Sequence, residues 1–173
     1  FIGDTTQGTE SNRLKIYING VQETSFSTAT YPSQNYEWQL QAIAKNFGIG
    51  AFAAENAGAS PSSFYLAEVV YLDGVAGSIG DFGEFDSDSP TIWKPIDVSG
   101  LTFGTNGFYL DFEDSSALGN DAAGSNNFTV NNLTAIDQTT DTCTNNFCTL
   151  SVTLNTAIEY SEGALKGVKA SGD

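Results

Sequence analysis

Length, composition and charge limit what this chain can be. Its 173 residues are 40% hydrophobic and 12% aromatic, enough for one core of ordinary size or for two small domains. Six Lys and Arg against 21 Asp and Glu leave a formal net charge of -15, which would repel a nucleic-acid backbone or an anionic membrane surface. The chain contains no histidine, so the usual general base and any Ser-His-Asp arrangement are excluded.

The composition predicts an all-β protein. Eighteen glycines, only 16% charged residues and no long amphipathic helical pattern favour short strands joined by turns. No apolar stretch approaches the length of a transmembrane helix, so we expect no membrane insertion. Because of the net negative charge, we also expect no nucleic-acid partner. The chain starts at Phe1 without an initiator Met or a signal peptide, which indicates a fragment of a longer polypeptide.

The first predicted element is a β-hairpin. Apolar and polar side chains alternate over residues 13–18, which is the period of a strand. Asn19-Gly20 follows, and both residues of this dipeptide tolerate the positive φ that a two-residue hairpin turn requires. We therefore predict that residues 21–26 return as the second strand.

Three more strands are predicted before residue 90. Two of them are short and are expected near residues 38–40 and 47–51. Residues 64–72 are apolar on both faces apart from Glu68, which is typical of a central strand covered on two sides. Residues 1–90 are accordingly assigned to one set of jelly-roll strands.

The second half of the chain begins with an extended connection over residues 91–106. Further strands are predicted at 108–112, 128–130 and 148–154, and they either close the first sandwich or open a second module spanning 107–158. Residues 159–173 have a weak pattern and are assigned to a tail. The side chains expected to point into the core are Leu14, Ile16, Ile18, Leu66, Val70, Phe108, Leu110 and Phe112.

About eight short strands with long polar loops predict an antiparallel two-sheet jelly-roll sandwich. Three segments resemble the laminin G-like, concanavalin A-like jelly rolls. These are residues 12–20 with their Tyr-Ile-Asn-Gly ending, residues 64–72, and residues 107–112 with the Asp, Gly and Asn-rich loop 121–127. The order departs from that family, because segments similar to its late strands precede one similar to its opening.

Further segments resemble tail-fibre-like virion proteins of aquatic bacteriophages. They are Tyr31–Asn35, Ser78–Asp88, Ile92–Pro95 and Thr144–Phe147. The resemblance implies a non-enzymatic structural or adhesion protein at the virion surface. Its partners would be other virion subunits or copies of itself, with a host-surface glycan as ligand. The alternative is a secreted bacterial or algal adhesin, or a carbohydrate-binding module of a larger extracellular or cell-surface protein.

The acidic run Glu84–Asp88 is the candidate for catalysis. Its carboxylates at 84, 86 and 88 superficially resemble the catalytic strand of laminarinase-type glucanases, which share the jelly-roll fold. Glycoside hydrolysis needs two carboxyl groups at a defined separation, one of them with a raised pKa. The flanking Gly, Ser and Pro residues favour a solvated acidic turn, so we predict no catalytic residue.

Oxygen ligands are concentrated in a second acidic region. Asp111, Asp114, Asp121 and Asn126 form a candidate calcium site, since calcium takes six to eight oxygen ligands. The alternative is turn chemistry, because Asp and Asn are also the preferred residues of Asx turns. No cofactor is required by either interpretation.

Two other features suggest specific chemistry. Cys143 and Cys148 could close a six-residue disulfide ring, or remain free thiols with Cys148 in the core. Tyr31 and Tyr36 lie in a polar loop and are the candidates for stacking on sugar rings, although most aromatic residues of a small sandwich serve the core or its rim.

Overall fold

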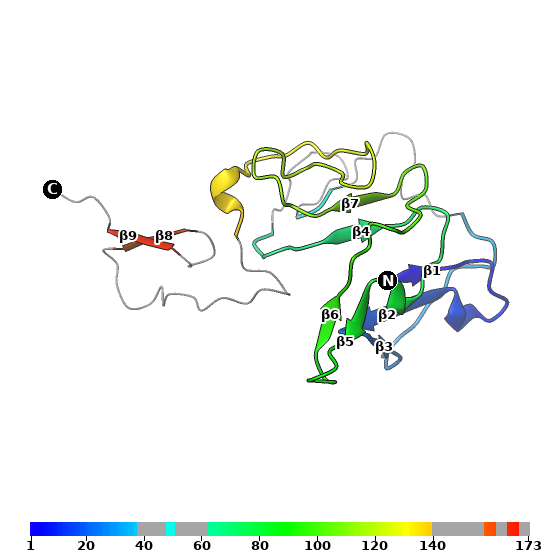
Figure 1. Ribbon diagram of the computed structural model, residues 1–173. Helices are drawn as coiled ribbons and strands as arrows, with labels where there is room; N and C mark the ends of the chain where they lie inside the picture. Colours follow the sequence, from blue (N-terminus) through cyan, green and yellow to red (C-terminus); the bar gives the residue numbers. More distant parts are fainter. Residues whose placement is uncertain (38–47, 51–61, 140–157, 162–165, 170–173) are drawn as a thin grey trace. The chain divides into compact units, whose positions relative to one another are not determined.

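The computed structural model describes residues 1–37, 48–50, 62–139, 158–161 and 166–169 (Figure 1). Every strand pair in it is antiparallel, and the helical elements described are three-residue 3-10 turns, which confirms the predicted all-β, antiparallel class. The strands are β1 (Ile2–Gly3), β2 (Leu14–Ile18), β3 (Val21–Glu23), β4 (Val69–Tyr71), β5 (Gly83–Phe85), β6 (Trp93–Pro95), β7 (Phe108–Leu110), β8 (Ile158–Ser161) and β9 (Lys166–Lys169). The 3-10 turns are η1 (Glu10–Asn12), η2 (Ile79–Asp81) and η3 (Ala135–Asp137).

The described strands form four small sheets, and no clear two-sheet sandwich is visible among them. Their orders are β1-β2-β3, β4-β7, β5-β6 and β8-β9. The chain divides into two compact units: unit 1 contains residues 1–66 and 74–98, and unit 2 contains residues 67–73 and 99–173. A search of the described residues for membrane-spanning helices finds none of sufficient length and apolarity.

The predicted hairpin is confirmed in unit 1. Ile18 pairs with Val21 across a two-residue turn, and Asn19 and Gly20 have φ of 49° and 80°. Both values lie in the left-handed region, which Asn and Gly adopt most readily. The returning strand ends at Glu23, earlier than the predicted residue 26.

The β5-β6 hairpin of unit 1 carries an aromatic pair. Phe85 is paired directly with Trp93, and their rings meet edge to face with centroids 5.1 Å apart. The Trp93 ring also lies against two glycines: a Cβ on Gly20 or on Gly83 would overlap it. The stretch predicted as an extended connection, residues 91–106, therefore includes one paired strand, β6.

Unit 2 contains the β4-β7 pair and most of the buried side chains. Phe108 and Leu110 on β7 are 5% and 2% exposed, and Tyr71 pairs with Phe108 across the two strands. The Phe128 ring packs against Phe108 edge to face, with centroids 4.8 Å apart. A β7 strand with an apolar face was predicted, and the burial of Phe108 and Leu110 confirms it.

Other predicted core positions are wrong. Ile16, Ile18 and Leu66 are exposed by 38%, 60% and 44%, whereas Leu14, Val70 and Phe112 are half-buried. The reason is that alternation along a strand predicts an apolar face, but burial needs a second layer against that face. Among the described residues, no such layer covers Ile16 and Ile18.

The predicted central strand over residues 64–72 is also wrong. Only Val69–Tyr71 pairs, in a two-stranded sheet, and Phe64 and Tyr65 are 54% and 82% exposed. Glu68 has φ of 52°, which is not a strand conformation, so the strand can begin only after it.

The remaining strand predictions have mixed outcomes. Residues 128–130 form no strand and instead belong to a loop that folds back onto β7. Residues 38–40 and 148–154 lie outside the described residues, and of 47–51 only 48–50 are described, without strand pairing. The expected tail contains most of the β8-β9 hairpin.

Candidate functional site

Asp121 is the most buried polar residue described, and it organises the loop that follows β7. The residue is only 3% exposed. Oδ1 accepts the backbone N–H groups of Tyr109 at 2.9 Å and Ala123 at 3.0 Å, and Oδ2 accepts the N–H of Asn126 at 2.9 Å. One carboxylate thus satisfies three backbone donors, one on β7 and two in the loop.

Two asparagines complete this arrangement, which we call the Asp121 loop (residues 119–128). Asn126 Nδ2 donates to the carbonyl oxygens of Thr105 at 3.0 Å and Gly107 at 2.8 Å. Asn127 Oδ1 accepts the N–H of Asp121 at 2.9 Å. The loop closes where the N–H of Phe128 donates to the Gly119 carbonyl at 2.7 Å, at a point where a Cβ on residue 119 would overlap the Phe128 carbonyl.

The four predicted calcium ligands are only partly brought together. Asp121 and Asn126 are in contact, but through the backbone N–H of Asn126. Asp111 accepts the N–H of Glu113 at 3.2 Å, and Asp114 accepts the N–H and hydroxyl of Ser116 at 2.8 and 2.6 Å. The Ser116 hydroxyl, followed by its N–H, holds the pKa of Asp114 below its ordinary value of 3.8.

These bonds are the ones that Asx turns make. Within the described ranges, no group of three or more His, Cys, Asp or Glu side chains is close enough to hold a metal ion. The calcium site therefore stays a prediction that rests on composition.

Two carboxylates of the acidic run Glu84–Asp88 form ion pairs with one lysine. Lys94 Nζ lies 3.3 Å from Glu84 Oε1 and 3.4 Å from Asp86 Oδ2, because Glu84 and Lys94 are directly opposite in the β5-β6 pair. Asp86 Oδ1 also accepts the N–H groups of Asp88 and Ser89, both at 2.9 Å. These backbone bonds, more than Lys94, lower the pKa of Asp86, whereas hydrogen bonding to Glu84 and then to Asp86 raises the pKa of Lys94.

The loop that carries Tyr31 and Tyr36 is bound by the Arg13 side chain in unit 1. Arg13 donates to the carbonyl oxygens of Gln7, Gly8 and Pro32 at 2.8 to 2.9 Å, which joins the loop to the segment before β2. Tyr36 is 47% exposed and Tyr31 is half-buried. Their suitability for sugar stacking stays a prediction.

Use of aspartate as a backbone acceptor extends well beyond the predicted site. Most described aspartates accept at least one backbone N–H, and these are Asp4, Asp73, Asp81, Asp86, Asp111, Asp114, Asp121 and Asp137. Much of the chain's acidity therefore stabilises its turns. This use of aspartate could have been predicted from the sequence, because most of these aspartates stand beside Gly, Ser, Thr or Asn, which are typical turn residues.

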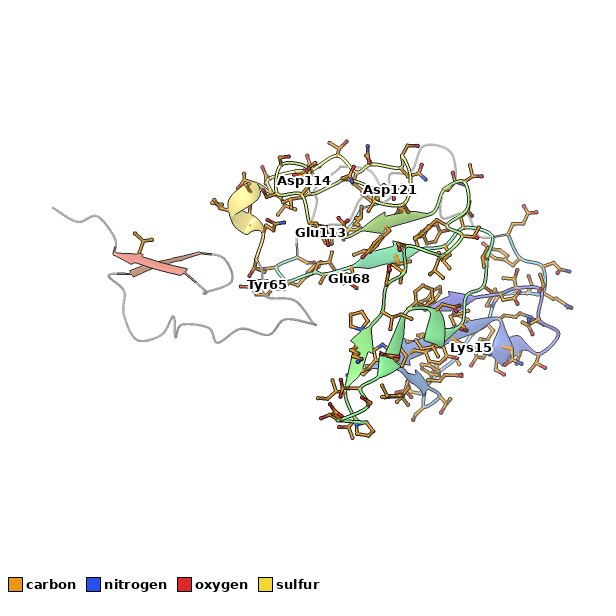
Figure 2. All side chains as sticks on the ribbon, viewed as in Figure 1. Lys15, Tyr65, Glu68, Glu113, Asp114 and Asp121 are labelled. Atoms are coloured by element: carbon orange, nitrogen blue, oxygen red, sulfur yellow. The ribbon has the colours of Figure 1, made fainter. Side chains whose placement is uncertain are left out.

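Sequence analysis missed a carboxylate pair in unit 2. Glu68, just before β4, has a raised pKa, chiefly because it is partly buried and secondarily because Glu113 lies near it (Figure 2). The only sequence signal was that Glu68 interrupts an apolar run. Its partner, 45 positions later, follows from the β4-β7 pairing and not from any local pattern.

Comparison with protein-family models, with curated proteins and with solved structures found no match to this chain. The remaining predicted site, Cys143 and Cys148, lies outside the described residues.

Proposed function

We propose that this chain is part of a non-enzymatic virion structural or adhesion protein, a phage tail fibre or a capsid or tail decoration. Its lectin-like jelly roll would contribute to assembly and to host-surface attachment. The virion setting comes from the sequence resemblance described above. It predicts a location at the virion surface, with copies of the chain or other virion subunits as partners.

The observation that carries the non-enzymatic part concerns the Glu84–Asp88 run, the segment that resembles a glucanase catalytic strand. Glu84 and Asp86 share Lys94, and Asp86 is further bound by two backbone N–H groups. These contacts stabilise the ionised form of Asp86, whereas a glycosidase needs one carboxyl group with a raised pKa. The arrangement suits a charged turn better than a general acid.

The jelly-roll part is supported by the apolar face of the β2-β3 hairpin. Ile18 and Val21 are directly paired and are 60% and 62% exposed. A sheet with an apolar face normally buries it against another layer, and in a sandwich that layer is a second sheet. The sandwich is therefore proposed for the protein in its assembled form.

Assembly is tested by sedimentation of the purified chain with calcium and, separately, with a chelator. We expect a species larger than the 18.3 kDa monomer, since the short strand edges and apolar faces that the described residues leave uncovered favour association. Faster sedimentation with calcium would support the bridging of carboxylates by the metal. A monomer in both solutions, with equal melting temperatures, would contradict both the assembly and the calcium proposals.

Catalysis is tested with laminarin, agarose and carrageenan as substrates. The chain should release no more reducing ends than its Glu84→Gln/Asp86→Asn double variant. The Lys94→Met variant is a useful control, because it removes the ion pairs of both carboxylates and keeps the carboxylates themselves. Turnover by the native chain that the double variant lacks would show that the non-enzymatic proposal is wrong.

The second candidate is a carbohydrate-binding module, favoured by exposed aromatic rings at Tyr36 and Tyr65, which are 47% and 82% exposed. Flat aromatic surface of this kind is suited to stacking on sugars. A glycan array probed with the native chain and with Tyr36→Ala and Tyr65→Ala tests it. Binding lost in either variant but kept in Tyr17→Ala, a tyrosine on β2, would favour this candidate.

A further inference from the structure

Asn-Gly occurs twice in the sequence, at residues 19–20 and 106–107. In this dipeptide the backbone nitrogen of Gly can attack the side-chain carbonyl carbon of Asn, because Gly has no Cβ to hinder the approach. A five-membered succinimide forms and ammonia leaves. Water then opens the ring at either carbonyl, which gives aspartate or isoaspartate. The reaction requires the Asn side chain and the following peptide to rotate together.

The second dipeptide is held in place. Asn106 Nδ2 donates to Asp73 Oδ2 at 2.8 Å, and the Asn106 backbone N–H donates to the same oxygen at 3.2 Å. Gly107 is buried, and a Cβ there would overlap the Phe103 carbonyl oxygen. Neither the carboxamide nor the following peptide can rotate without breaking these contacts.

The first dipeptide lies at the tip of the β2-β3 hairpin. Asn19 is exposed, and no described residue hydrogen-bonds to its carboxamide. The last pair of the ladder is Ile18 with Val21, so the peptide between Asn19 and Gly20 lies outside it. Asn19 has φ of 49°, a left-handed conformation that Asn adopts readily, and the following Gly20 is contacted by the Trp93 side chain and not, as Gly107 is, by a backbone carbonyl.

We propose that Asn19 is a site of spontaneous deamidation, and that the fold directs the reaction to Asn19 and away from Asn106. Gly20 N forms a bond to Asn19 Cγ, the Cγ–Nδ2 bond breaks, and the proton displaced from Gly20 N leaves with the ammonia. Solvent water then hydrolyses the ring. The product carries one more negative charge than the -15 of the native chain.

The isoaspartate product alters the hairpin itself. Its main chain is one methylene longer at residue 19, so the two-residue turn with both φ values positive no longer fits the Ile18–Val21 pair. The Trp93 ring, which lies against Gly20, would lose part of its contact. Ageing at Asn19 would therefore loosen β2-β3 while leaving unit 2 unchanged.

The test uses the whole chain, incubated at mildly alkaline pH both folded and in denaturant, with peptide mapping by mass spectrometry at intervals. Fragmentation by electron transfer separates isoaspartate from aspartate. In denaturant both asparagines should convert at similar rates, because both precede Gly. In the folded chain Asn19 should convert about tenfold faster than Asn106 or more, since Asn106 reacts only from a locally open state.

Two variants sharpen the result. Asn19→Gly retains a turn that accepts positive φ, and it should abolish conversion in the peptide that contains residue 19. Asp73→Ala removes the acceptor of the Asn106 carboxamide, so conversion at Asn106 should accelerate while Asn19 keeps its rate. Equal rates at the two sites in the folded native chain, or slower conversion at Asn19, would overturn the proposal, as would an unaccelerated Asn106 in folded Asp73→Ala.

Discussion

The β2-β3 hairpin of unit 1 and the β4-β7 pair of unit 2 have similar apolar patterns but different burial. Ile16 and Ile18 alternate along β2 as Phe108 and Leu110 alternate along β7. The two β2 side chains are 38% and 60% exposed, whereas the two on β7 are 5% and 2% exposed. The alternation of apolar side chains is therefore the same on β2 and β7, although only β2-β3 is a hairpin. Among the described residues, the difference in burial follows from the layer that covers each strand.

The covering layer of β7 is a loop held by one carboxylate. Asp121 binds the N–H of Tyr109 on β7 and two further N–H groups of its own loop, and the loop brings Phe128 against Phe108. The hydrogen bonds of the Asp121 carboxylate therefore hold the loop in the position that lets Phe128 pack against Phe108. The described part of unit 1 has no comparable loop over Ile16 and Ile18, and its apolar face stays open.

Replacing Asp121 should have the largest effect, because it would remove the difference in covering layer between β7 and β2. Asp121→Ala leaves three N–H groups without their acceptor, at roughly 1–3 kcal/mol each where burial excludes water, so we expect a loss of at least about 3 kcal/mol in the free energy of unfolding of unit 2. Hydrogen exchange at the amides of Tyr109, Ala123 and Asn126 measures it site by site.

Asp121→Asn is the matched control for this prediction. It keeps one oxygen acceptor and places an amide N–H₂ opposite a backbone donor, so its cost should be smaller, about 2 kcal/mol. Unchanged exchange at all three amides in Asp121→Ala would show that the carboxylate does not hold the loop.

A smaller effect is expected from matched truncations on the two strands. In the monomeric chain, Leu110→Ala should destabilise the protein by about 2–4 kcal/mol, since Leu110 is 2% exposed, whereas Ile18→Ala should cost less than about 0.5 kcal/mol. Denaturant unfolding of the two variants beside the native chain measures both. A cost above about 2 kcal/mol for Ile18→Ala would mean that a further layer covers β2-β3, as the sandwich requires.

The sequence predicts local features of this fold well. Alternation located β2 and β7, and Asn19-Gly20 gave the hairpin turn, because strand period and turn conformation depend on neighbouring residues. The burial of Asp121 was not predictable in the same way. Its partners include Tyr109, twelve residues away, and a loop of Asp and Asn looks the same in sequence whether it faces solvent or a strand.

The same limit applies to the candidate sites. The Glu84–Asp88 run was predicted as an acidic turn; Glu84 lies on β5, whereas the backbone bonds of Asp86 are those of a turn. The participation of Lys94 depends on the β5-β6 register, which no local pattern specifies. The Glu68–Glu113 pair depends on β4 pairing with β7, two segments about forty residues apart in the chain.

Acid should weaken turns in both regions, with smaller effects than the loss of a core side chain. Asp4 in unit 1 and Asp114 in unit 2 have pKa values below 3.8, chiefly because the hydroxyl groups of Thr6 and Ser116 donate to them. A folded pKa lower than the unfolded one gives stability that is present above about 3.8 and is lost as pH falls through the lowered value. Melting temperature should therefore decline below about pH 4.

Asp114→Asn tests whether the Asp114 turn contributes to this acid sensitivity. The variant cannot ionise at residue 114, so its melting temperature should depend less on pH below about pH 4 than that of the native chain, and Ser116→Ala should act in the same direction. Parallel pH profiles for all three proteins would contradict the assignment of acid sensitivity to this turn.

The smallest expected effect has the opposite sign and concerns the entrance to β4. Partial burial and then the nearby Glu113 raise the pKa of Glu68 above its ordinary 4.5. The folded chain therefore binds this proton more tightly than the unfolded chain does, so the favourable contribution is present below about pH 4.5 and is lost as pH rises through the raised value. Glu68→Gln should stabilise the protein at about pH 7 by at most about 1 kcal/mol, reduced by solvent screening, and should give no gain at about pH 4.

Glu113→Gln should give a smaller gain in stability than Glu68→Gln, because burial raises the pKa of Glu68 more than the like charge of Glu113 does. Thermal melts at both pH values decide the matter, and an equal gain at pH 4 and pH 7 would assign the effect to the backbone conformation of residue 68 instead of to its charge.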